Sequence, residues 1–178
     1  NDGRIIILNY KGKLTSNPKI LKLNLEEGES VSKVFENSDN SYKLLTSQAG
    51  SHGSVFTYKV YDLQINENSM ETNLEYTLDD VILSSWSNNS KFIACLFQKG
   101  NRRHIQIYSL WDKQVVKEFS LESISATYHS AASPSSRYVS SMAIDSSGTQ
   151  LALGFASGVV NVLNVSDLQG RLLKWHID

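Results

Sequence analysis

Short runs of apolar residues, or of alternating apolar and polar residues, recur along the whole chain. Clusters of Gly, Asn, Ser and Asp separate these runs. Long stretches with an apolar residue at every third or fourth position, typical of amphipathic helices, are missing. The pattern therefore predicts an all-β protein made of many short strands.

The repeating unit is clearest near the end of the sequence. The runs YVSSMAID and QLALGFA predict two strands joined by the turn SSGT. After Ser157 and Gly158 comes a third predicted strand, VVNVLNV, and beyond a loop a fourth, RLLKWHI. Four strands in about 40 residues match the size of one β-propeller blade.

The same order of four runs fits two earlier stretches, of which the second includes VILSSWS, KFIACLFQ, HIQIYSL and QVVKEFSL. The opening runs, RIIILNY and PKILKLNL, match only the outer two strands of a blade. We therefore predict that residues 1–178 belong to a single WD-repeat-type β-propeller domain with about three and a half blades of four antiparallel strands. Its predicted parts are an outer half blade at 1–25, blades at 30–79, 80–122 and 137–178, and a Ser-rich loop at 123–136.

The Trp-Asp pair of this chain does not lie where WD repeats carry theirs. In such repeats the pair closes the third strand of the blade. Aligning the four third strands places Leu8-Asn9, Tyr61-Asp62, Tyr108-Ser109 and Leu163-Asn164 at that position. Trp111 and Asp112 follow three residues later, in the predicted turn. The repeat is therefore a degenerate one, and it is identified by its strands and turns.

Three and a half blades cannot bury all of their apolar faces, because each blade packs against its neighbours and the ring must close. We therefore expect this chain to be a segment of a longer protein. The sequence does not indicate what closes the ring.

Composition narrows the possible functions. Hydrophobic residues make up 40% of the chain and charged residues 20%, as in a globular protein. No apolar run approaches the roughly 20 residues of a membrane helix, so no membrane association is expected. The net charge of −1 argues against a dedicated nucleic-acid binder. The charge is uneven, however: residues 1–25 carry +4, residues 26–80 carry −8 and residues 81–178 carry +3.

We find no pattern of residues that predicts catalysis. The four histidines are far apart, and the single cysteine, Cys95, lies in the apolar run FIACLF, where we expect it to be buried. Neither a G-x-S-x-G motif nor a glycine-rich phosphate-binding loop is present. The sequence therefore predicts a non-enzyme with no catalytic residue, no cofactor, no metal and no small-molecule substrate.

Two basic segments are candidates for RNA binding. The loop KGNRRH joins the second and third strands of a blade, and the opening segment is rich in lysine. Arginine side chains match the geometry of phosphate groups. A solvated turn is the alternative interpretation of such charged runs. The candidate RNA-binding residues are Lys11, Lys13, Lys99, Arg102 and Arg103.

Four segments together resemble a known family of WD-repeat proteins. They are RIIILNYKGKL, RYVSSMAID, QLALGFASGVV and LQGRLLKWHID. They are similar to the N-terminal propeller of the U three protein seventeen family, called WD-repeat protein seventy-five in animals. Its members are subunits of the UtpA (t-UTP) subcomplex of the small-subunit processome. The likeness is dense over residues 137–178 and thin over 26–80 and 99–136.

The resemblance implies a non-catalytic scaffold in the nucleus and nucleolus. Its partners would be other WD-repeat and helical subunits of UtpA, the leading spacer of the ribosomal RNA precursor and the snoRNA-containing particle. The role would be to support precursor binding and processing and assembly of the small ribosomal subunit, with a link to ribosomal DNA transcription.

Two other functions remain open on the sequence, because a fold does not determine a function. One is a generic WD-repeat scaffold in another complex, such as a vesicle coat or a ubiquitin-ligase receptor. The other is a propeller hydrolase, which would require a polar cluster at the mouth of the central channel.

Overall fold

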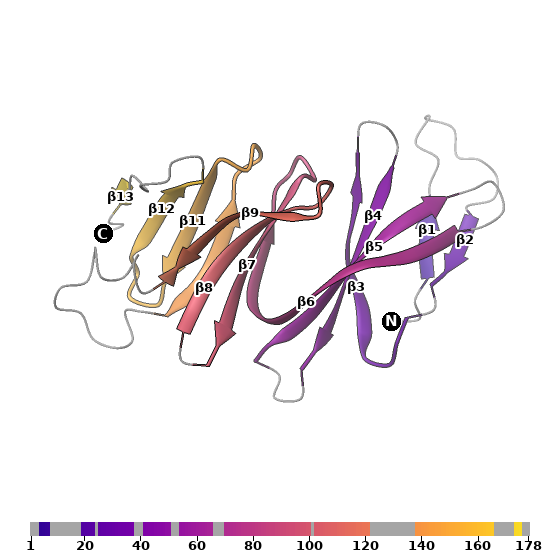
Figure 1. Cartoon of the computed structure of the whole chain (residues 1–178), viewed down its shortest axis with the longest axis horizontal. Helices are drawn as coiled ribbons and strands as arrows, with labels where there is room; N and C mark the ends of the chain where they lie inside the picture. The colour runs from indigo at the N-terminus through magenta and orange to yellow at the C-terminus, as the bar shows by residue number, and fades with distance from the viewer. Residues whose placement is uncertain are drawn as a thin grey trace. The chain divides into compact units, whose positions relative to one another are not determined.

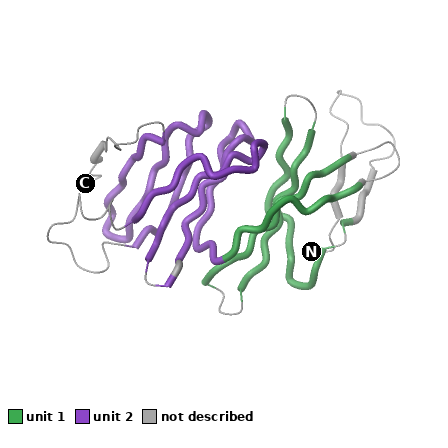
Figure 2. The backbone as a smooth tube through the Cα atoms, viewed as in Figure 1, with its two compact units in different colours: residues 1–79 green, residues 80–178 purple. Residues whose placement is uncertain are grey.

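The computed structural model divides the chain into two compact units, residues 1–79 and 80–178 (Figure 2). We describe each unit by itself. The structure describes residues 4–7, 19–23, 25–37, 41–50, 54–65, 70–100, 102–121, 138–165 and 173–175. The predicted Ser-rich loop at 123–136 lies outside these residues.

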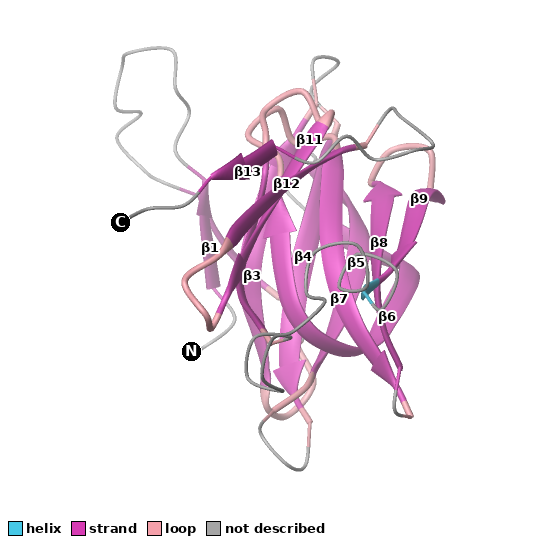
Figure 3. Ribbon diagram, turned by 90° about the vertical axis from the view of Figure 1, so that its left-hand side faces the viewer, coloured by secondary structure: helices cyan, strands magenta, loops and turns pink. Residues whose placement is uncertain are grey.

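The elements of the described chain, β1 to β13, are all strands (Figures 1 and 3). Neighbouring strands pair in an antiparallel manner, as in β10 with β11 and β11 with β12. The predicted all-β class, with antiparallel strands, is confirmed. The domain and blade boundaries given above stay predictions.

Unit 1 contains a two-stranded sheet and a larger ladder. The small sheet pairs β1 (Arg4–Ile7) with β2 (Lys19–Lys22). The ladder consists of β3 (Glu29–Glu36), β4 (Tyr42–Ala49), β5 (Phe56–Ile65) and the first part of β6 (Met70–Trp86). Leu23, which follows β2, packs in a buried cluster with Leu44 and Leu63. This contact attaches the end of the small sheet to the ladder.

Unit 2 contains two four-stranded arrangements. The first consists of the last part of β6, β7 (Phe92–Lys99), β8 (Arg102–Ser109) and β9 (Gln114–Ser120). The second consists of β10 (Val139–Ile144), β11 (Gln150–Phe155), β12 (Val160–Asn164) and β13 (Leu173–Trp175). The reversals that the structure describes in full, at 87–91, 110–113, 145–149 and 156–159, are short, so the strands that they join are neighbours in their sheets.

β6 differs from the sequence expectation. The runs LEYTL and VILSSWS predict two strands, but the structure has one strand from Met70 to Trp86. No Gly or Pro separates the two runs. Asp80 instead adopts a φ of 57°, a left-handed conformation that aspartate tolerates better than most residues. The strand therefore continues through the two runs with one residue of unusual backbone conformation at their junction.

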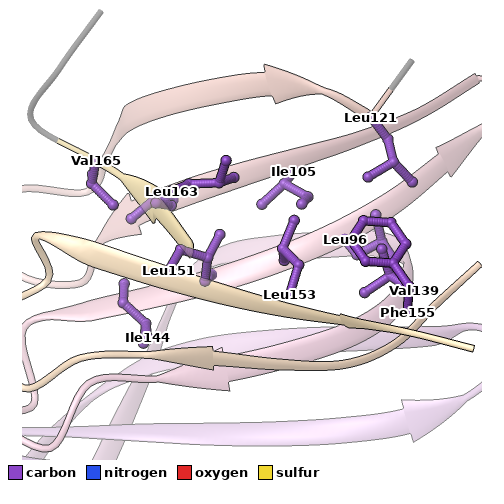
Figure 4. Packing of buried hydrophobic residues seen from close by; sticks show 12 residues of the cluster. Leu96, Ile105, Leu121, Val139, Ile144, Leu151, Leu153, Phe155, Leu163 and Val165 are labelled. Atoms are coloured by element: carbon purple, nitrogen blue, oxygen red, sulfur yellow. The ribbon is translucent and has the colours of Figure 1, made fainter. Parts of the chain in front are cut away.

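Alternation of side chains builds the core of unit 2. In β8, Ile105 and Ile107 are fully buried, and in β11 Leu151 and Leu153 are fully buried. These residues belong to a cluster that joins the two sheets of the unit, and Figure 4 shows several of them facing one another. Residues two apart on a strand share a face, so the period-2 pattern of the sequence translates directly into this cluster.

The pairing of β8 with β9 contains a bulge. Ile107 is opposite Lys117 and Tyr108 is opposite Val115, so Val116 has no partner residue on β8. The side chain of Val116 is 47% exposed. An extra residue of this kind bends a strand and interrupts the regular spacing of its backbone groups.

A glycine in the turn after β10 allows this turn to pack closely against the start of β7. Gly148 has a φ of 74°, and its amide donates a hydrogen bond to the Asp145 carbonyl at 3.2 Å. A Cβ at this position would overlap with Cδ2 and Cε2 of the Phe92 ring. Both the backbone conformation and the close approach therefore require glycine.

We predict that Gly148→Ala destabilises the protein by about 2–4 kcal/mol, because it adds backbone strain and a clash in a packed interior. Gly158→Ala is the matched control. Gly158 also has a positive φ, 82°, but no atom lies within 4 Å of its would-be Cβ. Its cost should be about 1–2 kcal/mol, from strain alone. Denaturant titrations of the two variants measure both values.

The added substitution Phe92→Leu should recover part of the Gly148→Ala loss, because it removes the ring that the new Cβ meets. Equal costs for Gly148→Ala and Gly158→Ala, with no recovery by Phe92→Leu, would contradict this account of the contact.

Candidate functional site

The hairpin between β7 and β8 carries the described part of the predicted basic loop. Lys99 pairs with Arg102, and Gln98 with Arg103, so both arginines belong to the strand ladder rather than to a free loop. Gly100 turns the chain with a φ of 59°, and its carbonyl accepts a hydrogen bond from Gln98 Nε2 at 3.3 Å. The Gln98 side chain thus ties Gly100 to the end of β7.

The two arginines lie on opposite faces of β8, because successive side chains of a strand alternate. Arg103 shares a face with the buried residues Ile105 and Ile107. Arg102 shares the other face with His104, and its side chain is exposed. The pair therefore cannot act as a single fork on one phosphate group, which the sequence alone did not reveal.

Arg103 stacks on an aromatic ring from the second sheet of unit 2. Its Cζ atom lies 4.5 Å from the centroid of the Tyr138 ring, within the distance of a cation–π interaction. Tyr138 comes just before β10 and is 53% exposed. Its carbonyl accepts a hydrogen bond from the Ala156 amide at 2.9 Å. The backbone that carries the ring is thus bonded to the residue that follows β11.

His104 is engaged in a different contact. Its ring stacks on Phe97 with centroids 5.3 Å apart and an interplanar angle of 16°. Phe97 in turn meets Tyr108 edge-on at 6.3 Å. Since this stack covers one side of the imidazole, we do not include His104 in the candidate site.

The structure brings together only part of the predicted RNA-binding set. Lys11 and Lys13 lie outside the described residues, and of Lys99 only the backbone is described. Arg103 and Tyr138 lie in contact, and Arg102 precedes Arg103 on the opposite face of β8. Tyr138 was missed because its run, YVSSMAID, is typical of a buried strand. The structure begins β10 one residue later, which leaves the ring at the surface.

Trp111 and Asp112 lie in the turn after β8, which ends at Ser109. Ser109 Oγ donates a hydrogen bond to Asp112 Oδ2 at 2.7 Å. Trp111 Nε1 donates to the carbonyl of Ser90, also at 2.7 Å, and Ser90 belongs to the turn between β6 and β7. The pair therefore stabilises two adjacent turns and marks no ligand site.

A buried polar network in unit 1 surrounds Glu29. Its carboxylate accepts hydrogen bonds from Thr46 Oγ1, from the Tyr61 hydroxyl at 3.0 Å and from the Glu26 amide at 3.0 Å. Lys59 Nζ lies 3.7 Å from Glu29 and 2.7 Å from Glu26. Every buried oxygen of Glu29 therefore has a donor, which is typical of a structural carboxylate.

The pKa values of this network follow from its contacts. Burial alone would raise the pKa of the Glu29 carboxyl, but the hydrogen bonds from Thr46, the Glu26 amide and Tyr61, with the charge of Lys59, outweigh it and lower that pKa. The hydrogen bond to Glu26 raises the pKa of Lys59, against the effect of its burial. Burial and the bond to Glu29 raise the pKa of Tyr61. Glu29 and Lys59 are thus held in their ionised forms at neutral pH, and Tyr61 in its neutral form.

A second buried ion pair in unit 1 joins Lys43 Nζ to Glu75 Oε2. The two side chains are 3% and 7% exposed. Removal of one partner of such a pair leaves an uncompensated buried charge and is strongly destabilising. This pair, like the Glu29 network, is part of the interior of the unit.

Other reactive groups in the described chain are buried or dispersed. Burial raises the pKa of the Cys95 thiol far above its ordinary value, so the nucleophilic thiolate is disfavoured. Burial, with the nearby Cys95 and Glu118, raises the pKa of Tyr108 to about 12. The described residues hold no group of three or more His, Cys, Asp or Glu side chains suited to a metal ion. No helix among them is long and apolar enough to cross a membrane.

Comparison with known proteins agrees with the geometry. No known family profile matches the sequence. Over 189 aligned residues the chain is 39% identical to NET1-associated nuclear protein 1 of Saccharomyces cerevisiae, with 100% of this chain and 21% of the relative covered. The chain therefore spans about a fifth of the length of this curated relative.

Solved structures show the fold. The crystal structure of Chaetomium thermophilum Sqt1 matches 99% of this chain and 44% of its own, with 16% identity and a TM-score of 0.56. The β-propeller domain of the Trilobed protease from Pyrococcus furiosus matches 86% of this chain and 45% of its own, with 8% identity and a TM-score of 0.44, too low to carry an argument. The fold is that of a partial, WD-repeat-like β-propeller.

The polar network of unit 1 gives a pH prediction. Because the folded pKa of Glu29 is lower than its ordinary value of 4.5, the ionised carboxylate contributes stability above that pH. The contribution is lost as the pH falls below 4.5 towards the folded pKa. Glu29→Gln should cost roughly 1–3 kcal/mol at neutral pH and flatten this part of the acid profile.

Denaturant titrations at a series of pH values measure the effect. Glu27→Gln is the control, because Glu27 is exposed and it is its backbone carbonyl that accepts a hydrogen bond from Gln48 Nε2 at 2.8 Å. An acid profile of Glu29→Gln that matches the wild type would show that the network does not hold this carboxylate ionised.

Proposed function

We propose that this chain is part of a non-catalytic scaffold subunit of the nucleolar small-subunit processome. In this role it supports binding and processing of the ribosomal RNA precursor and assembly of the small ribosomal subunit, with a link to ribosomal DNA transcription. The observation that carries the proposal is the 39% identity, along the whole chain, to a protein named as nuclear. The proposal that the complex is the small-subunit processome rests on the resemblance of the propeller segments to the U three protein seventeen family.

The chemistry of the described residues is consistent with a scaffold. The buried carboxylates and lysines form ion pairs inside unit 1. Glu29 lies near Lys59, and Lys43 pairs with Glu75. A propeller offers rigid edges and loops for several partners at once. We therefore propose contacts with other WD-repeat and helical UtpA subunits, and with the particle that contains the leading spacer of the precursor and snoRNA.

The two-stranded sheet of β1 and β2 supports the idea of an incomplete ring. A blade of this architecture has four strands, and the described residues supply β1 and β2 alone in this sheet. We propose that other residues of a longer protein complete this blade and close the ring. The length of the curated relative supports this, since the chain covers 21% of it.

The basic residues remain candidates for the RNA side of this role. We propose Lys11, Lys13, Lys99, Arg102 and Arg103 as contacts to the precursor, with the lysines and Arg102 acting on the phosphate backbone. Such contacts position a protein on RNA and depend on salt rather than on base sequence. The net charge of −1 limits this contribution, so protein partners are expected to provide most of the binding energy.

Affinity purification of the tagged, full-length protein from cells tests the proposal. We expect enrichment of the leading spacer of the ribosomal RNA precursor and of the other UtpA subunits, and a nucleolar signal in imaging. Depletion should lower the mature small-subunit ribosomal RNA while the large-subunit RNA is maintained. Purification with vesicle-coat or ubiquitin-ligase subunits, without precursor RNA, would reject the processome in favour of another scaffold.

A further inference from the structure

The stack of Arg103 on Tyr138 is a surface feature that the packing of unit 2 does not require. The Tyr138 ring is 53% exposed although it is a large aromatic group, and the guanidinium covers part of it at 4.5 Å. Tyr138 does not belong to the buried cluster that joins the two sheets of the unit. An exposed aromatic ring beside a guanidinium group offers a surface on which another planar group can stack.

Both partners of the stack are attached to ordered backbone. Arg103 lies in the β7–β8 ladder opposite Gln98, and the Tyr138 carbonyl is bonded to the Ala156 amide after β11. The two sheets of the unit thus present the ring and the guanidinium together. Binding to such a preformed surface loses little conformational entropy.

The chemistry of this surface fits a nucleobase. Aromatic rings stack on bases of any sequence, and a guanidinium plane adds a cation–π contribution. Arg102 is exposed and has no ion pair with a described carboxylate, so its charge is available for a phosphate. The exposed positive charge of Arg102 favours a negatively charged occupant, such as a nucleic acid, over an apolar peptide.

We infer that Tyr138 and Arg103 form a stacking platform for one base of a single-stranded RNA, and that Arg102 contacts the adjacent backbone as a point charge. The choice of RNA rests on the proposed function. The two arginines have different roles, because only Arg103 needs a planar group. Lysine therefore replaces Arg102 but not Arg103.

The test measures binding of the purified full-length protein to a single-stranded RNA of about 16 nucleotides and mixed sequence, by fluorescence anisotropy. Tyr138→Ala should weaken binding roughly fivefold to a hundredfold, and Tyr138→Phe should retain it. Arg103→Lys should weaken binding several-fold, while Arg102→Lys stays close to the wild type. Lys91→Ala, at the other end of β7, is the control for a general loss of charge and should bind like the wild type.

Tyr138→Leu provides a second variant that keeps an apolar side chain beside the hairpin, and its thermal unfolding is compared with that of the wild type. Wild-type affinity in a folded Tyr138→Ala or Tyr138→Leu protein overturns the inference. So do equal losses for Arg102→Lys and Arg103→Lys, which indicate a diffuse charge effect. Tyr138-dependent binding to an acidic peptide, with none to the RNA, assigns the surface to a protein partner and also overturns it.

Purification of the variants from cells separates this inference from the proposed function. Tyr138-dependent RNA binding in a protein that does not join the processome supports the platform and rejects the proposed function. A wild-type protein that joins the processome but binds no single-stranded RNA supports the proposed function and rejects the platform.

Discussion

An antiparallel blade has two faces, and a four-stranded sheet cannot keep its apolar face out of water by itself. In unit 2 this requirement is met by a second sheet. Ile105 and Leu151, from different sheets, belong to one buried cluster. Each fully buried aliphatic side chain contributes about 1.5–3 kcal/mol. Turns, hairpin ends and the surface ring of Tyr138 all keep their places because this face-to-face packing holds the two sheets together.

The alternation of buried and exposed side chains along each strand was predictable from the sequence. The run QLALGFA buries Leu151, Leu153 and Phe155 and exposes the residues between them more, as alternation requires. Glu29 was not predictable, because its partners Thr46 and Tyr61 lie 17 and 32 residues away. A pattern within a short stretch of sequence cannot show that residues so far apart along the chain are in contact. Tyr138 was missed for a related reason: the residue that covers its ring, Arg103, comes from another sheet.

The role of each polar residue in the described chain depends on where it lies rather than on its residue type. Interior groups such as Glu29 and Lys43 are matched with partners and stabilise unit 1. Turn groups such as Asp112 and Trp111 stabilise reversals of the chain. What remains for recognition is a small number of surface groups around rigid hairpin ends. A protein of this construction acts through its shape and edges, which agrees with the scaffold role proposed above.

The bulge at Val116 affects how readily the edge strand β9 can pair with a strand of another protein. In the described chain β9 is the last strand of its sheet, and a regular edge would offer evenly spaced amides and carbonyls to any passing strand. The unpaired Val116 disturbs that spacing, and Lys117 adds a charge beside it. Two copies therefore meet edges that do not match. An irregular and charged edge of this kind is a poor template for pairing with a strand of another chain.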